Sequence, residues 1–352
     1  MPDPGESQEP SAGRRRVWQR IAAVPTPLIF LFSVAVALAI LWRQGSFSDV
    51  WDAARRADAL TIAAGLILYL IGLALLSVRW HILVLMINGA SRLPRAAEAF
   101  LTSVVVNYAA PIGLAVPTRA ALTKRSLGLT TAQTGAVALW EVALDVIVLA
   151  LFTLVWLVVI RSEIGELGRP SDGQLTASAV IITAGILLLT AGALYLRRKG
   201  RWWGRLRHLA QKTATYPLRR PRVAALATGA TIVYWLGQAL VLWLLLAALT
   251  DDASATLALG LASLPVLVGM LSPVPGGAGI REALMLAVAR IHDADTGAVL
   301  LAALTYRVAL FLAIPVLYAG VRLWPGVDGP ASPAAPGRGT MSAAAPDDHS
   351  RG

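Results

Sequence analysis

Six stretches of this chain are each apolar over enough residues to cross a lipid bilayer. A helix needs about 20 residues to span the hydrocarbon core. Only 14% of the 352 residues are charged and 57% are hydrophobic, whereas a soluble domain carries about 25% charged residues. The sequence therefore predicts an all-α polytopic membrane protein. Its spans are expected near residues 21–42, 60–78, 132–160, 175–196, 223–249 and 296–321.

The two ends of the chain and the loop charges predict how such a protein is oriented. Residues 1–20 and 325–352 are expected to be disordered tails flanking one transmembrane domain over 21–324, since neither can bury a core. The net charge of +11 is explained by the positive-inside rule, without a nucleic-acid partner. If basic loops face the cytoplasm, both termini lie there too, in a cell-membrane protein. The basic positions are Arg14–Arg20, Arg79, Arg92, Arg95, Lys124, Arg125 and the loop 197–222.

Two further apolar segments, 95–128 and 254–291, are interrupted by proline and glycine. Each reads as a helical run, a break, and a second short helical run, because proline removes a backbone donor and blocks the preceding turn. Irregular backbone at membrane depth is tolerated where protein buries it or water lines it. Re-entrant hairpins keep every strongly basic loop on one side, so we expect six full spans plus two broken re-entrant hairpins. Full crossing of each hairpin remains the alternative.

The two broken segments align without gaps at an offset of 162 residues. The order of elements also matches, as span, span, hairpin and span, over about 21–160 and again over about 175–322. In the expected topology the two copies enter the membrane from opposite sides, which is the inverted repeat of many secondary transporters. Chance similarity is the alternative reading. The matching pairs are Pro111 and Pro273, Arg119 and Arg281, Gly135 and Gly297, and Asp145 and Arg307.

An arginine follows each break by a few residues, as Arg119 in the first segment and Arg281 in the second. A helix that starts after a break directs its N–H groups and positive dipole end toward the break, which favours an anion there. The arginine adds a donor fork suited to phosphate, and Gly276, Gly277 and Gly279 would let an anion approach the backbone. The alternative is that these residues only shape a turn while the arginines reach an interface.

Three charged residues fall inside predicted spans. Glu141 and Asp145 are four residues apart and share one helix face, and Arg307 lies near the middle of the last span. Each costs about 2.5–3.5 kcal/mol at the bilayer centre. Because Asp145 and Arg307 occupy equivalent repeat positions, an ion pair joining the halves is one hypothesis. Direct contact of these groups with a headgroup or a proton is the other.

Several kinds of chemistry have no residues to support them. The chain has no cysteine, and its four histidines show no metal-ligand spacing, so no metal site or cofactor is expected. No phosphate-binding loop, nucleophile elbow or dinucleotide fingerprint is present. The sequence therefore predicts a protein that is not an enzyme.

The chain resembles the lysylphosphatidylglycerol synthase transmembrane region, also called the flippase-like domain family, over roughly residues 20–322. The most specific stretch of this resemblance is P-x-P-G-G-x-G-x-R-E at Pro273–Glu282. Two departures make the first half less polar than the family pattern: Ala115 and Val116 replace a Gly-Glu pair, and Val142 replaces an arginine. The remaining matches are Arg79-Trp80, Asn107–Pro111, Arg119, Glu141, Asp145 and Arg307.

The resemblance implies a flippase or transporter that moves a phospholipid or a polyprenyl-phosphate-linked lipid between leaflets without ATP hydrolysis. It is expected as a stand-alone membrane domain, lacking the aminoacyl-transfer domain of the synthases. Its expected partners are membrane lipids with an anionic headgroup, and a lipid-synthesis enzyme is a further candidate partner. The alternatives are an accessory protein or enzyme of lipid-linked glycan or glycolipid assembly, or a small-solute secondary transporter. The predicted substrate-binding residues are Asn107, Arg119, Glu141, Asp145, Gly276, Gly277, Gly279, Arg281, Glu282 and Arg307.

Overall fold

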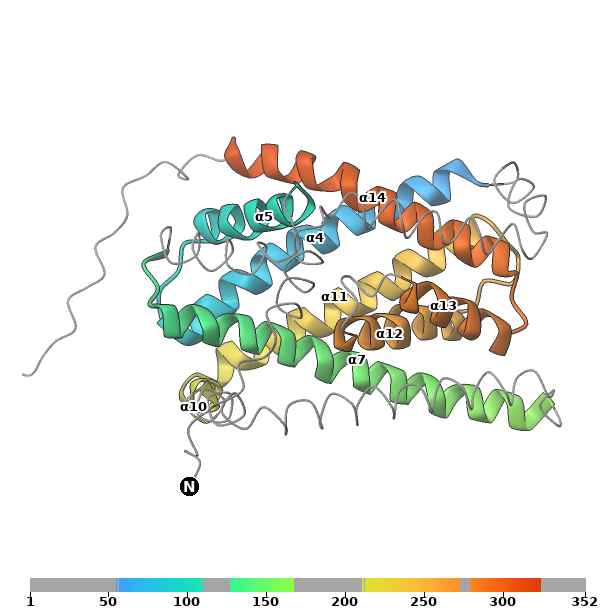
Figure 1. Ribbon diagram of the computed structural model, residues 1–352, viewed down its shortest axis with the longest axis horizontal. Coiled ribbons are helices and arrows are strands. Elements are labelled where there is room, and N and C mark those ends of the chain that lie inside the picture. Colours follow the sequence, from blue (N-terminus) through green and yellow to red (C-terminus); the bar gives the residue numbers. More distant parts are fainter. Residues whose placement is uncertain are drawn as a thin grey trace, which may run out of the picture.

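The computed structural model describes residues 55, 57–109, 127–167, 211, 213–272 and 279–323. Within these ranges every regular element is an α-helix, as the all-α prediction requires (Figure 1). The helices are α4 (Ala59–Asn88), α5 (Leu93–Ala109), α7 (Thr131–Leu167), α10 (Thr215–Arg219), α11 (Pro221–Ala247), α12 (Ala255–Leu271), α13 (Ile280–Ile291) and α14 (Thr296–Arg322).

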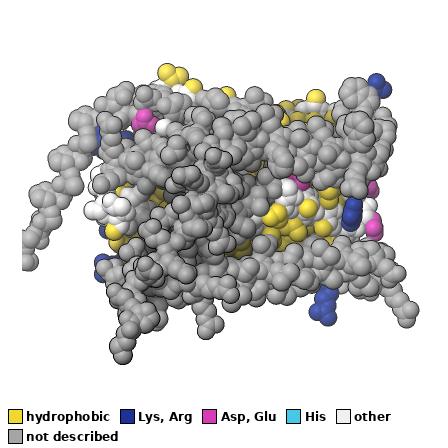
Figure 2. Space-filling view, in the orientation of Figure 1, with side chains coloured by type: hydrophobic (Ala, Val, Ile, Leu, Met, Phe, Trp, Pro, Cys, Tyr) yellow, Lys and Arg dark blue, Asp and Glu magenta, His cyan; other side chains and the backbone are white. Residues whose placement is uncertain are grey.

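Three of these helices, α4, α7 and α11, are long and apolar enough to cross a membrane. Large hydrophobic side chains remain exposed along them, including Ile67 on α4, Leu154 on α7 and Val233 on α11. In Figure 2 the described surface is largely hydrophobic where it is visible, and most visible lysines and arginines lie toward the ends of the long axis. An apolar belt of this extent is a surface that lipid covers.

The observed helices agree in position with three of the predicted spans and correct one. Helices α7, α11 and α14 match the runs at 132–160, 223–249 and 296–321. The run predicted at 60–78 is wrong at its end, because α4 continues to Asn88. The predicted spans 21–42 and 175–196 lie outside the described residues.

This correction changes the place of Arg79. It belongs to the interior of α4, where only 3% of it is exposed, and not to a basic loop. The helix continues because the residues after it, Ile82–Ile87, are again mostly apolar.

Helices α4 and α11 form the centre of the bundle and run in opposite directions (Figure 1). At one end, the Asp58 amide donates to the carbonyl of Ala248 over 3.1 Å. At the other end, the Arg220 guanidinium donates to the carbonyl of Leu85 beside Gly89. Gly89 ends α4 with φ of 82°, a left-handed conformation that glycine adopts without strain.

The start of α4 carries its own cap. The Asp58 carboxylate accepts hydrogen bonds from the amides of Leu60 at 3.1 Å and Thr61 at 3.3 Å, and also from the Thr61 hydroxyl. These bonds satisfy helix donors that have no partner within the helix. The hydroxyl bond of Thr61, followed by the amide bond of Leu60, lowers the pKa of Asp58, because both favour the ionised carboxylate.

The second broken segment forms two helices, as predicted. Helix α12 is capped by Ser254 and packs against α13, which begins after the break. Helix α12 also packs against α7, where Trp156 donates to the imidazole of His292 at 3.0 Å directly over Gly260. In the first broken segment the described helix is α5; residues 110–126, which hold the expected break and most of the second helical run, lie outside the described residues.

Corresponding helices of the two predicted copies have related positions. Helices α4 and α11 begin 162 residues apart, and α5 and α12 both begin and end 162 residues apart. Helix α7 runs opposite to α14 as α4 runs opposite to α11 (Figure 1). Contacts are matched too: α7 packs against α12, and α14 packs against α5.

Candidate functional site inside the helix bundle

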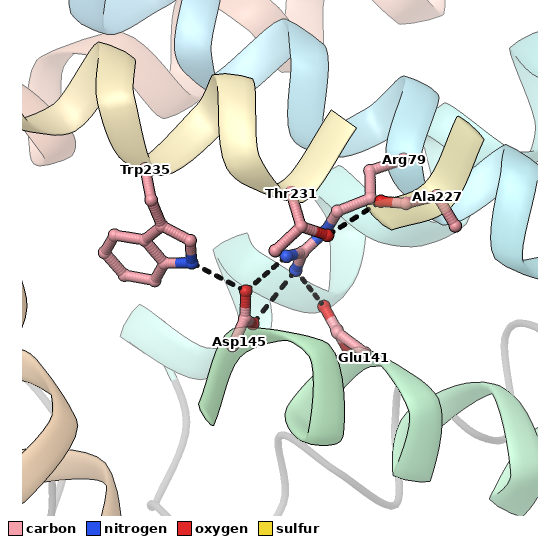
Figure 3. A network of polar contacts seen from close by, with 6 residues as sticks. All are labelled: Arg79, Glu141, Asp145, Ala227, Thr231 and Trp235. Carbon is pink, nitrogen blue, oxygen red and sulfur yellow. Dashed lines mark hydrogen bonds and ion pairs between the residues drawn. The ribbon is translucent and has the colours of Figure 1, made fainter. Parts of the chain in front are cut away.

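A buried charge network joins the middle of α4 to α7 (Figure 3). The Arg79 guanidinium binds Asp145 through both nitrogens, with Nη2 3.1 Å from Oδ2 and Nη1 on Oδ1. The same Nη2 lies 3.4 Å from Oε1 of Glu141. Asp145 and Glu141 are 8% and 9% exposed, so the whole group is removed from solvent.

Helix geometry explains why one arginine meets two carboxylates. Residues four apart on a helix are neighbours on its surface, so Glu141 and Asp145 face α4 together. Helix α11 completes the network, because the Trp235 indole donates to Asp145 Oδ1 at 2.9 Å. The Tyr234 ring contributes a cation–π contact, with its centre 5.8 Å from the Arg79 guanidinium carbon.

The arrangement suits groups that lack water around them. A buried charge requires both a counter-charge and hydrogen bonds to offset its lost hydration, and Arg79 has these from two acids. The bidentate contact with Asp145 is the stronger geometry. Thr231, drawn beside the network, donates instead to the Ala227 carbonyl of its own helix at 2.8 Å. The network therefore ties α4, α7 and α11 together.

A second polar cluster forms around Tyr306 of α14. The Tyr306 hydroxyl donates to Oε1 of Gln238 on α11. The guanidinium carbon of Arg281 lies 5.7 Å from the centre of the Tyr306 ring. The Tyr69 and Tyr306 rings meet edge to face at 4.8 Å. This cluster brings one positive charge together with neutral groups.

The two clusters are close to each other. Tyr234, whose ring lies over Arg79 of the first cluster, is four residues from Gln238 of the second on α11, and both side chains lie beside Gly72 of α4. Polar groups from α4, α7, α11, α13 and α14 therefore converge inside a bundle whose outer surface is apolar. A concentration of polar groups within a membrane domain is where a polar ligand would be held.

The start of α13 has an acidic side chain in place. The Gly279 amide donates to Glu282 Oε2 at 2.7 Å, and Glu282 is 4% exposed. This is the half of a capping box in which the third residue of the helix reaches back to the cap amide. Gly279 has φ of 83°, so glycine is the residue that fits there. Glu282, predicted as a substrate ligand, thus has a capping contact.

The structure describes part of the predicted site. It brings Glu141 and Asp145 together on α7, and it places Arg281 beside Tyr306. Asn107 and Arg307 belong to α5 and α14, but their side chains lie outside the described residues, so the Asp145–Arg307 pair stays a prediction. Arg119, Gly276 and Gly277 are outside the described residues as well.

Sequence reasoning missed Arg79, Trp235, Gln238 and Tyr306 as members of these clusters. A signal for Arg79 existed, since two carboxylates four residues apart inside a span require a nearby cation. An apolar run that ends at residue 78 instead places this arginine in a loop. No comparable signal marks the other three, since neutral residues within a span have no obligatory partner.

Comparison with known proteins supplies a family. No curated protein and no solved structure matched the chain significantly. The family model described as the lysylphosphatidylglycerol synthase transmembrane region matches residues 29–318, which includes every helix of both polar clusters except the last residues of α14. This family match and the apolar helices together show that the chain is a membrane protein. The chain belongs to the lysylphosphatidylglycerol synthase transmembrane region family.

Proposed function

We propose that this protein moves a phosphate-bearing lipid, either a phospholipid or a polyprenyl-phosphate-linked lipid, between membrane leaflets without hydrolysing ATP. The observation that carries the proposal is the convergence of charged and hydrogen-bonding side chains inside an apolar helix bundle. Holding Arg79, Glu141 and Asp145 there costs about 2.5–3.5 kcal/mol for each charge on membrane-insertion scales. A passive anchor would gain nothing from that cost, whereas a carrier of polar headgroups requires such an interior.

The two clusters have different tasks in this proposal. Arg79 is occupied by Asp145 and Glu141, so its network holds α4, α7 and α11 in place. Arg281 is only partly buried and has a neutral neighbour in Tyr306. Its guanidinium is therefore the group that engages the headgroup phosphate, for which a planar donor fork is well suited. Arg119 and the glycines at 276 and 277 remain predicted members of the same site.

The inverted repeat belongs to this proposal, because it provides a route between the two sides. Three features support it: the 162-residue spacing of helix boundaries, the opposite directions of α4 and α11, and the matched packing of α7 on α12 and α14 on α5. In transporters built this way, substrate sites lie near the midplane beside broken helices, and one half moves against the other. The break before α13 is where such a site would form.

Reconstitution tests the function directly. Purified protein is incorporated into liposomes that contain headgroup-labelled phosphatidylglycerol or, separately, labelled phosphatidylcholine, and no ATP is added. We expect movement of the anionic lipid, reduced about tenfold or more in Arg281→Gln. Arg290→Gln, on the same helix but exposed, is the matched control and should behave as the wild type.

The same preparation separates the alternatives. If neither a labelled phospholipid nor, in parallel liposomes, a labelled polyprenyl-phosphate lipid moves under any ion gradient, the flippase proposal is wrong. Uptake of a soluble phosphorylated compound in its place would identify a small-solute transporter.

A further inference from the structure

We propose that Gln238 is a further ligand-binding residue that donates its side-chain amide to a phosphoryl oxygen of the ligand. The inference rests on the proposed function and deepens it, because it names a second donor beside Arg281. Gln238 lies on α11 and is 1% exposed. Gln238 is uncharged and lies within the apolar run of α11, so the sequence alone does not single it out.

The Tyr306 hydroxyl determines which way the Gln238 amide points. A phenolic hydroxyl has one hydrogen to donate and two lone pairs that accept. The hydroxyl hydrogen is directed to Oε1 of Gln238. The amide is thereby held with its NH₂ group turned away from Tyr306.

That NH₂ group has no hydrogen-bond partner among the described residues, although it is buried. Leaving a buried donor unsatisfied destabilises the folded state. The opposing helix is shaped to admit it: a Cβ added at Gly72 of α4 would lie 2.8 Å from Nε2. Any larger residue at position 72 would collide with the amide nitrogen. Gly72 thus leaves room for a donor that the folded chain itself does not use.

The chemistry around this position selects the class of ligand. Gln238 offers two N–H donors, and Arg281 offers the donors of a guanidinium that also lies against Tyr306. The acceptor oxygen of Gln238 is already occupied. A site that presents donors and a positive charge fits an acceptor-rich anion, and phosphoryl oxygens meet that description. They belong either to a lipid headgroup or to a soluble phosphate ester.

Direct binding to the full chain in detergent micelles tests the role of Gln238 without requiring transport. Native mass spectrometry measures the occupancy by phosphatidylglycerol and by phosphatidylcholine as each lipid is titrated. In Gln238→Leu we expect affinity for phosphatidylglycerol to fall roughly ten- to a hundredfold, the range of one hydrogen bond to a charged group. Phosphatidylcholine also carries a phosphate, so its weaker binding should fall in parallel.

Two further variants keep the test decisive. Gln238→Glu preserves the shape and an acceptor for Tyr306 but replaces the donor with a carboxylate, so anionic-lipid binding should fall at least as far. Ser263→Ala is the control, since this buried hydroxyl donates to Leu259 of its own helix at 2.7 Å and should leave binding unchanged. If both Gln238 variants bind as tightly as the wild type, the inference is overturned.

Competition with glycerol 3-phosphate identifies the source of the phosphoryl group. Suppose that glycerol 3-phosphate displaces phosphatidylglycerol from the wild type and displaces it equally well from Gln238→Leu. The inference then fails for soluble phosphate esters and holds for the lipid. The two proposals also fail separately. Gln238-dependent binding by a protein that moves no lipid would end the flippase proposal alone. Lipid transport with equal affinities in wild type and Gln238→Leu would end this inference alone.

Discussion

Replacing Arg79 with methionine should destabilise the bundle more than any other single change in the first cluster. Methionine fills a similar length, so packing is largely kept while the charge and its donors are removed. Asp145 and Glu141 are then left as two buried carboxylates without their counter-charge. Removing one partner of a buried ion pair costs about 3–5 kcal/mol, and the loss of two contacts by one substitution places Arg79→Met at the upper end.

The contact geometry also predicts the order of the acidic variants. Asp145 accepts hydrogen bonds from both terminal guanidinium nitrogens of Arg79 and from the Trp235 indole. Its Oδ2 lies 3.1 Å from Arg79 Nη2, and its Oδ1 lies 2.9 Å from the indole nitrogen. Asp145→Asn keeps an oxygen for the indole but loses the charge, so about 1.5–3 kcal/mol is expected. Glu141 makes one contact of 3.4 Å with Arg79, so Glu141→Gln should cost about 1 kcal/mol or less.

Unfolding by sodium dodecyl sulfate in mixed micelles, followed by tryptophan fluorescence, measures these free energies. The double-mutant cycle of Arg79→Met with Asp145→Asn should give a coupling energy of about 1–3 kcal/mol. Adding Glu141→Gln to that pair should restore stability, because a neutral network leaves no unpaired charge. The reasoning is refuted if Arg79→Met costs less than about 1 kcal/mol, or if Glu141→Gln costs as much as Asp145→Asn.

Three further results are expected. Gly260→Ala should lower the melting temperature by an amount equivalent to about 1–3 kcal/mol, because its Cβ would lie 2.5 Å from the Trp156 indole nitrogen. Asp58 has a folded-state pKa below its ordinary value of 3.8, lowered first by the hydrogen bond from the Thr61 hydroxyl. The stability that the ionised Asp58 carboxylate contributes is therefore present above pH 3.8 and is lost as the pH falls through the folded-state pKa. Acid should therefore lower the melting temperature less in Asp58→Asn, which still caps the helix, and equal acid sensitivity would contradict this account. Since the chain has no cysteine, a single cysteine introduced as Ser91→Cys or Asp251→Cys is a unique labelling site. An impermeant maleimide should label only Asp251→Cys in intact cells. Labelling of both variants would reject the expected topology.

The sequence was sufficient to predict most described helices and insufficient to predict their polar partners. The bilayer imposes a minimum apolar length, so α7, α11 and α14 could be read directly from the runs of hydrophobic residues. The position of Arg79 inside a helix could not be predicted in this way. The cost of burying its charge is offset by Glu141 and Asp145, which lie 62 and 66 residues further along the chain. Such compensation is visible only once the helices are packed together.

Glu282 shows a different kind of miss, because the information was local. The spacing from Gly279 to Glu282 is that of a capping residue and the third residue of a helix, which favours a side-chain cap. The stretch was interpreted as an anion site for an external ligand because glycines and an arginine surrounded it. Both interpretations use the same free amides, and the chain's own carboxylate meets one of them.

If the proposed phosphate site includes this helix end, the capping contact limits how tightly a phosphate is held there. A carboxylate attached three residues away competes for the Gly279 amide intramolecularly, and such tethered groups act at effective concentrations of the order of millimolar or more. An incoming anion must therefore displace a resident one to use this amide, so part of its gross binding energy is cancelled. Exchange at this helix end replaces one anion with another, which favours rapid release over tight retention.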